Sequence, residues 1–184
     1  KGWSFFRREA FDEFYPGYGV SWPTLTGAIG MTYEQASSRG GAIRRSDGTV
    51  LTLEQAIRQH HTAAWATVRT AALRRAERVR DYIAFRSTAI IEAKRSGMRA
   101  LVFEPDAQGR SAPLAELLAR NGIEVQRLRG EVEVRDATPY GEAEPRRVRL
   151  PAGAYVTDLA QPAGRLSKAI LQPNAELDSA FIAA

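Results

Sequence analysis

One carboxylate near the start of the chain has a sequence setting that suits general-base chemistry. Glu34 ends a short segment, 31–34, which has strand propensity and follows the glycine-containing stretch 27–30. Alternation along a strand would place Thr32 and Glu34 on the same face. A carboxylate held there in a partly dry cleft would have its pKa raised toward the range of a general base. The local pattern leaves an alternative open, namely a solvated glutamate at the end of a strand.

Few other residues have types suited to catalysis or metal binding. Tyr15 and Tyr18 precede Glu34 by 19 and 16 residues. The two histidines, His60 and His61, are adjacent, so on a helix their rings would point about 100° apart and would not readily chelate one ion. We therefore expect packing or capping roles for them. The chain has no cysteine, which excludes disulfides, thiolate zinc sites and cysteine nucleophiles.

Taken in order, these motifs resemble the carboxypeptidase A-like zinc peptidases. In that family a tyrosine on a mobile loop precedes a strand that ends in Thr-aromatic-Glu, and Thr32, Tyr33 and Glu34 are similar to that ending. Either Tyr15 or Tyr18 is similar to the loop tyrosine. Similarity to a bacterial branch of the family covers nearly the whole chain, through the stretches 14–19, 30–35, 151–156 and 160–162 and the helix that carries His60 and His61.

The resemblance implies metal-assisted hydrolysis of a peptide bond at the C-terminus of a peptide substrate, with zinc as the cofactor. Glu34 would take a proton from the attacking water and pass it to the departing amine. The matching tyrosine would close over the substrate. The residues beside the substrate specificity pocket would be Gly27, Ile29 and Gly30.

The zinc ligands of that family are unmatched in this sequence. The family uses a His-x-x-Glu motif and a later histidine, all upstream of the tyrosine and the glutamate, whereas both histidines of this chain follow Glu34. We therefore expect no metal ligands among these residues and place them on a missing N-terminal part of the catalytic domain. On this interpretation the 184 residues alone are inactive, and the whole enzyme is secreted or periplasmic.

Two regions that differ in composition and predicted secondary structure must position these residues. Residues 1–50 hold 9 of the 16 aromatic residues together with glycine and proline turn signals, which is typical of a loop-rich surface with a few short strands. Residues 52–95 are predicted to be helical, beginning with a capping box formed by Thr52 and Gln55. A continuous helix of that length would be unusual, so we expect a break near 85–87. One buried stripe is predicted from the apolar residues Leu53, Ile57, Ala64, Val68, Ala72, Val79 and Ile83.

The last region alternates between strands and helices. A strand at 99–103, a helix at 113–121 and a strand at 123–128 form a βαβ pattern, which favours a parallel sheet with a right-handed crossover. An exposed or edge strand, a further sheet strand and a last helix are expected at 131–135, 154–159 and 164–171.

The predicted fold class is therefore α/β, in two parts. Residues 1–95 are expected to form the C-terminal part of a carboxypeptidase-like α/β sheet domain with a long helix, and residues 97–184 a small parallel α/β domain. The resemblance implies that this second domain is an accessory unit with an amidotransferase-like fold that lacks the catalytic residues. We expect a scaffold or docking role for it.

Composition restricts the partners. The net charge of +5 arises from 23 arginines and 3 lysines scattered through every segment, whereas a nucleic-acid-binding protein would gather its cations on one face. No apolar run is long enough to span a bilayer. We expect a peptide substrate as the partner, with no nucleic acid and no membrane. Two alternatives to the peptidase remain: a non-catalytic module that recognises a peptide or cell-wall ligand, and a basic domain associated with nucleic acid.

Overall fold

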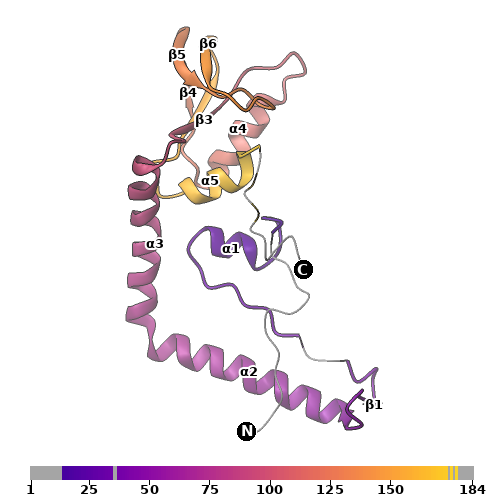
Figure 1. Cartoon of the computed structure of the whole chain (residues 1–184). Helices are drawn as coiled ribbons and strands as arrows, with labels where there is room; N and C mark the ends of the chain where they lie inside the picture. Colours follow the sequence, from indigo (N-terminus) through magenta and orange to yellow (C-terminus); the bar gives the residue numbers. More distant parts are fainter. Residues whose placement is uncertain (1–13, 35–36, 174, 176, 178–184) are drawn as a thin grey trace.

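The computed structural model describes residues 14–34, 37–173, 175 and 177. Within them the chain forms five helices and three small sheets, all with antiparallel pairing, so the mixed α/β class is confirmed. Residues 1–13, Gln35 of the 30–35 stretch and the last residues of the second predicted domain lie outside the described part. Figure 1 shows two long helices, α2 and α3, that meet at a corner, with the β1 hairpin at the far end of α2 and the other small elements beside and above α3.

The first described elements are a short helix and a hairpin. Helix α1 (Ser21–Leu25) is followed by β1 (Ala42–Arg44) and β2 (Val50–Thr52), which pair antiparallel. The turn between the strands contains Asp47, whose carboxylate accepts hydrogen bonds from the backbone N–H of Thr49 at 2.9 Å and from its hydroxyl at 2.6 Å. Gly48 has a φ of +82°, which glycine adopts without steric cost. This hairpin leads directly into the first long helix.

Helix α2 (Leu53–Leu73) begins at the predicted capping box. The Thr52 hydroxyl accepts a hydrogen bond from the Gln55 backbone N–H at 3.2 Å, and the Gln55 side chain accepts one from the Thr52 backbone N–H at 3.1 Å. These reciprocal bonds satisfy two backbone donors that the first turn of a helix leaves without partners. The helical prediction for this region is confirmed.

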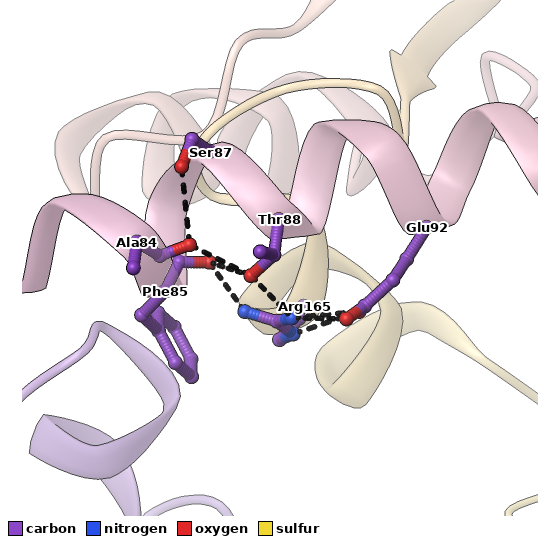
Figure 2. Close-up of polar contacts among 6 residues, drawn as sticks. All are labelled: Ala84, Phe85, Ser87, Thr88, Glu92 and Arg165. Carbon is purple, nitrogen blue, oxygen red and sulfur yellow. Dashed lines mark hydrogen bonds and ion pairs between the residues drawn. The ribbon is translucent and has the colours of Figure 1, made fainter. Parts of the chain in front are cut away.

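The break in the helical region lies earlier than predicted. Helix α3 (Arg75–Arg95) follows α2 after Arg74, which has φ −106° and ψ 21°, whereas residues 85–87 stay helical. The hydroxyls of Ser87 and Thr88 both donate to the carbonyl oxygen of Ala84, so these polar side chains are satisfied inside the helix (Figure 2). No glycine or proline marks the break at Arg74, which is why the sequence did not locate it.

The apolar stripe predicted for the two long helices is not buried within the described chain. Val68, for example, is 63% exposed and Ile83 is 59% exposed. The covered side of α2 is its more polar face, where the Thr67 hydroxyl lies 2.9 Å from the hydroxyl of Tyr33. Large apolar side chains that point away from the rest of the described chain in α2 and α3 include Leu53, Ile57, Trp65, Val68, Leu73, Val79 and Ile83.

The last region has its elements near the predicted positions, but its sheet is not parallel. Strands β3 (Ala100–Phe103) and β4 (Gln126–Arg127) flank α4 (Ser111–Arg120), as the βαβ pattern requires. They do not pair with each other, because β7 (Tyr155–Asp158) lies between them and pairs antiparallel with both. The two flanking strands keep a common direction, but a later strand occupies the central position with Thr157 fully buried. The predicted parallel sheet is therefore wrong.

The main core lies between α4 and α5 (Gly164–Leu171). Leu118, Ile123, Ala163 and Leu166 form a buried cluster. Trp22 and Leu25, from the α1 region, pack against this cluster. The aromatic loop region and the last region of the chain thus contribute to one core.

Two further features complete the arrangement. Strands β5 (Val132–Ala137) and β6 (Arg146–Leu150) form a separate two-stranded hairpin that stands away from the core in Figure 1. Helix α5 is joined to α3 through Arg165. Its guanidinium donates to both carboxylate oxygens of Glu92 and to the hydroxyl of Thr88, and lies 4.3 Å from the centre of the Phe85 ring (Figure 2). Arg165 also donates to the backbone carbonyl of Phe85.

Candidate functional site

The two candidate loop tyrosines form one compact unit before α1. The rings of Tyr15 and Tyr18 contact edge to face, with their centres 5.4 Å apart, and the Tyr18 backbone N–H donates to the Tyr15 carbonyl at 3.1 Å. The Tyr15 ring lies over Gly17, where an added Cβ would come within 2.5 Å of it. Glycine at position 17 is therefore required for this arrangement of the two rings. Both side chains remain largely exposed.

A cavity of about 310 Å³ adjoins this unit. One wall comes from the aromatic loop and α1, and the other from α4 and α5. Its lining is mostly apolar and aromatic, with one amide and one phenol as polar groups, which is the usual character of a small-ligand site. The lining residues are Tyr15, Pro16, Gly17, Trp22, Leu117, Leu118, Asn121 and Ile170.

Glu34 lies apart from both the tyrosine unit and the cavity. The predicted strand over 31–34 does not form, because these residues have no regular secondary structure and no pairing partner within the described chain. The Glu34 side chain is exposed, does not line the cavity, and makes no hydrogen bond or ion pair that joins it to another described residue. Its neighbour Tyr33 ties this segment to α2 through the hydroxyl contact with Thr67 at 2.9 Å. The partly dry cleft expected around the carboxylate is not formed by the described residues.

The positions expected beside the specificity pocket have clear packing roles where they are glycine. Gly27 has a φ of +102°, and an added Cβ would lie 3.1 Å from both the Phe85 and Tyr82 rings. At Gly30 a Cβ would lie 2.5 Å from the carbonyl oxygen of Val20. Backbone conformation and close packing thus account for these two glycines.

Ile29 differs from the glycines on either side of it. Its side chain is 57% exposed and does not line the cavity beside Tyr15. The three candidate pocket positions therefore combine two closely packed glycines with one apolar side chain that is open to solvent.

The described residues do not provide a zinc site. His60 and His61 are both exposed on α2, in the adjacent positions that point apart on a helix. No group of three or more His, Cys, Asp or Glu side chains in the described part of the chain is arranged to hold a metal ion. The zinc that the family resemblance implies does not fit these residues. The helices of the described part also include none that is long and apolar enough to cross a membrane.

The most extensive hydrogen bonding around a carboxylate in the described chain was missed by the sequence analysis. Asp106, in the loop before α4, accepts hydrogen bonds from the Ser111 hydroxyl at 2.7 Å, the Ser111 backbone N–H at 2.8 Å and the Gln108 backbone N–H at 3.0 Å. The Ser111 hydroxyl is the main cause that holds the pKa of the Asp106 carboxyl far below its usual range. This carboxylate caps the start of α4 and is too weak a base to accept a proton near neutral pH. The available sequence signal was an aspartate in a turn just before a helix.

Comparison with known proteins identifies no relative of this chain. Neither a protein family, nor a curated protein, nor a solved structure matches this chain. We therefore infer function from the motif resemblance together with the geometry described above.

Proposed function

We propose that this chain is the C-terminal part of a zinc-dependent carboxypeptidase that hydrolyses peptide bonds at the C-terminus of peptides. Glu34 would be its general base, and Tyr15 or Tyr18 would contact the substrate. The observation that carries the proposal is the set of exposed apolar side chains just before Glu34, the residue that resembles the family's catalytic glutamate.

Three large apolar side chains precede Glu34 at alternate positions along the chain. Ile29, Met31 and Tyr33 are 57%, 47% and 50% exposed. Burying such side chains contributes about 25 cal/mol for each Å² removed from water, so exposing several together favours a covering partner. The apolar face of α2, with Trp65 63% exposed, extends the uncovered surface. These exposures support an upstream half of the catalytic domain that packs against the Glu34 segment.

The chemistry assigned to Glu34 is that of a carboxylate which forms no ion pair with any described residue. Such a carboxylate can accept a proton from a water that attacks the scissile carbonyl, and can then donate it to the leaving amine. Covering the segment would remove the carboxylate from bulk solvent and enclose the reacting groups. The zinc ligands would belong to the covering half, since the described residues do not supply them. A secreted or periplasmic location is part of the same proposal.

Extending the reading frame upstream tests the proposal. The longer protein should contain a His-x-x-Glu motif with a later histidine and should release C-terminal amino acids from peptides in a zinc-dependent manner. The 184-residue chain assayed beside it should release none. A longer protein that folds, binds zinc and leaves peptides intact would contradict the proposal.

A second candidate function rests on the cavity beside Tyr15. Its walls combine the aromatic loop with α4 and α5, so the described chain forms this cavity without any further segment. A non-catalytic module that accepts an apolar side chain of a peptide or cell-wall ligand would use such a site. Titration of the 184-residue chain with the tripeptide Gly-Gly-Phe, followed by Trp22 fluorescence, separates the two functions. Saturable binding that Ile170→Ala weakens, without hydrolysis by the longer protein, would favour the binding module.

A further inference from the structure

A second candidate site is a shallow, open depression where β4 ends beside the turn before β7, and none of its lining residues is assigned to hydrolysis. Its volume is about 550 Å³. It belongs to the region around the 151–156 stretch, to which the proposed hydrolysis gives no role. The lining residues are Arg127, Leu128, Arg129, Ala152 and Gly153, so two cations and no carboxylate form its wall.

The backbone around this site is tied down on both sides. The Gly153 N–H donates to the Leu128 carbonyl at 2.8 Å, and the Leu128 N–H donates to the Ala154 carbonyl at 2.8 Å. These bonds join the turn before β7 to the segment after β4. Arg127 is the last residue of β4 and Arg129 lies two positions further on, in a bend, so this fixed frame carries both arginines.

The Arg127 side chain is held without a carboxylate partner. Its guanidinium lies 5.8 Å from the centre of the Tyr155 ring, and that ring stacks on Phe103 with centres 5.2 Å apart. Cation–π contact orients a guanidinium while leaving its hydrogen-bond donors available. The positive charge is thus positioned at the site in advance of any ligand.

Neither lining arginine forms an ion pair with a described residue. The neighbouring hairpin β5–β6 differs, because Arg146 is paired with Glu142 at 2.8 Å and Arg147 with Glu133 at 3.4 Å. Among the described residues no carboxylate neutralises Arg127 or Arg129, so both charges are available to an anion at this site.

Gly153 keeps the floor of the site open. It has a φ of +89°, and an added Cβ would lie 3.3 Å from the Arg127 Nη2 atom and 3.5 Å from Pro105. A side chain there would press on the Arg127 guanidinium. A glycine at this position preserves both the backbone conformation and the access of a ligand to the arginine.

We propose that this site binds a small molecule carrying a doubly charged oxyanion, either a phosphate monoester or a dicarboxylate. Each guanidinium presents a planar pair of donors that matches two oxygens of such a group, and two arginines match its two negative charges. This assignment is independent of the proposed hydrolysis. It gives the last region of the chain a ligand in addition to its structural role.

The proposal can be tested by calorimetric titration of the 184-residue chain with inorganic phosphate and, in a separate experiment, with succinate. Comparing the two titrations shows whether the site prefers a phosphate or a dicarboxylate. We expect saturable 1:1 binding of at least one probe, weakened roughly ten- to hundredfold by Arg127→Gln or Arg129→Gln, as expected for loss of a charge-assisted hydrogen bond. Arg135→Gln removes the same charge from an exposed position on β5 outside the site and should leave binding unchanged. Arg127→Lys keeps the charge and should also weaken binding, since it loses the paired donors.

Circular dichroism of each variant checks that the fold is retained. Absence of saturable binding of both probes to the wild-type chain would overturn the proposal. So would equal affinities in the folded wild-type, Arg127→Gln and Arg129→Gln proteins. A loss in Arg135→Gln as large as that in the site variants would also overturn it, because it would indicate attraction by net charge alone.

Discussion

Arg165 on α5 holds Glu92 on α3 through both carboxylate oxygens, with its Nη2 atom 2.7 Å from each (Figure 2). The two residues are 73 positions apart in the sequence, so this pair fixes the long helix against the last region of the chain. The same guanidinium covers the Phe85 ring and contacts Thr88. Because α5 also places Leu166 in the core, Arg165 links α3 to the element that carries this core residue.

Removing the Arg165 side chain should destabilise the protein more than removing the charge of its partner. We expect Arg165→Ala to lower the free energy of unfolding by about 2–3 kcal/mol, because it loses several hydrogen bonds and the ring contact together. Glu92→Gln should cost at most about 1 kcal/mol, since Glu92 is exposed. Urea denaturation measures both. Arg80→Ala, on an exposed part of α3, is the control, and a loss as large as that of Arg165→Ala would contradict this account.

Asp106 should make stability fall in acid. Because its pKa in the folded chain is lowered, the unfolded chain binds the proton more readily, so the stabilising contribution is present above about pH 4 and is lost as the pH falls further. Denaturant unfolding from pH 6 down to pH 2 should show this decline in the wild type and a shallower one in Asp106→Asn. Asp136→Asn, an exposed aspartate on β5, should follow the wild type. Parallel curves for Asp106→Asn and the wild type would refute the assignment.

Gly30 should be sensitive to a single methyl group. Its Cβ position lies 2.5 Å from the Val20 carbonyl oxygen, so we expect Gly30→Ala to lower the free energy of unfolding by about 1–3 kcal/mol through overpacking. Gly19→Ala, where nothing lies within 4 Å of the added atom, is the matched control and should be close to neutral. Equal stabilities for the two variants would show that close packing does not explain the glycine at position 30.

The apolar face of α2 should make the 184-residue chain bind hydrophobic dyes and self-associate. Val68→Glu places a charge on that face and should reduce both ANS fluorescence and the sedimentation-derived mass. Thr70→Glu introduces the same charge about 200° around the helix and should change neither quantity. A wild-type chain that is monomeric and silent toward ANS would count against a covering partner for this face.

Local signals predicted the individual elements well. The capping box at Thr52 and the helix 164–171 depend on residues within a few positions of each other, and both are present. Sheet order is different, because it depends on pairings such as that of Leu101 with Thr157. The spacing of strand, helix and strand favours two parallel strands that pair with each other. This local pattern does not indicate that a later strand lies between them.

The candidate site was predicted only in part, because it too depends on contacts between residues far apart in the sequence. The sequence offered Tyr15 and Tyr18 as alternatives for one loop tyrosine, and the structure shows that their two rings contact each other. The opposite wall of the cavity comes from Leu117 and Ile170, whose approach to Tyr15 depends on the tertiary packing of α1 against α4 and α5. The cleft expected around Glu34 depended on a strand that does not form in the described chain.

The most direct test of the proposed function changes one atom of Glu34. In the upstream-extended protein, Glu34→Gln keeps the size of the side chain and removes its basicity. We expect kcat for release of the C-terminal amino acid to fall by roughly 10²–10⁴-fold, with KM little changed. Glu144→Gln, an exposed glutamate between β5 and β6, should retain full activity. A Glu34→Gln enzyme as active as the wild type would show that this carboxylate is not the base.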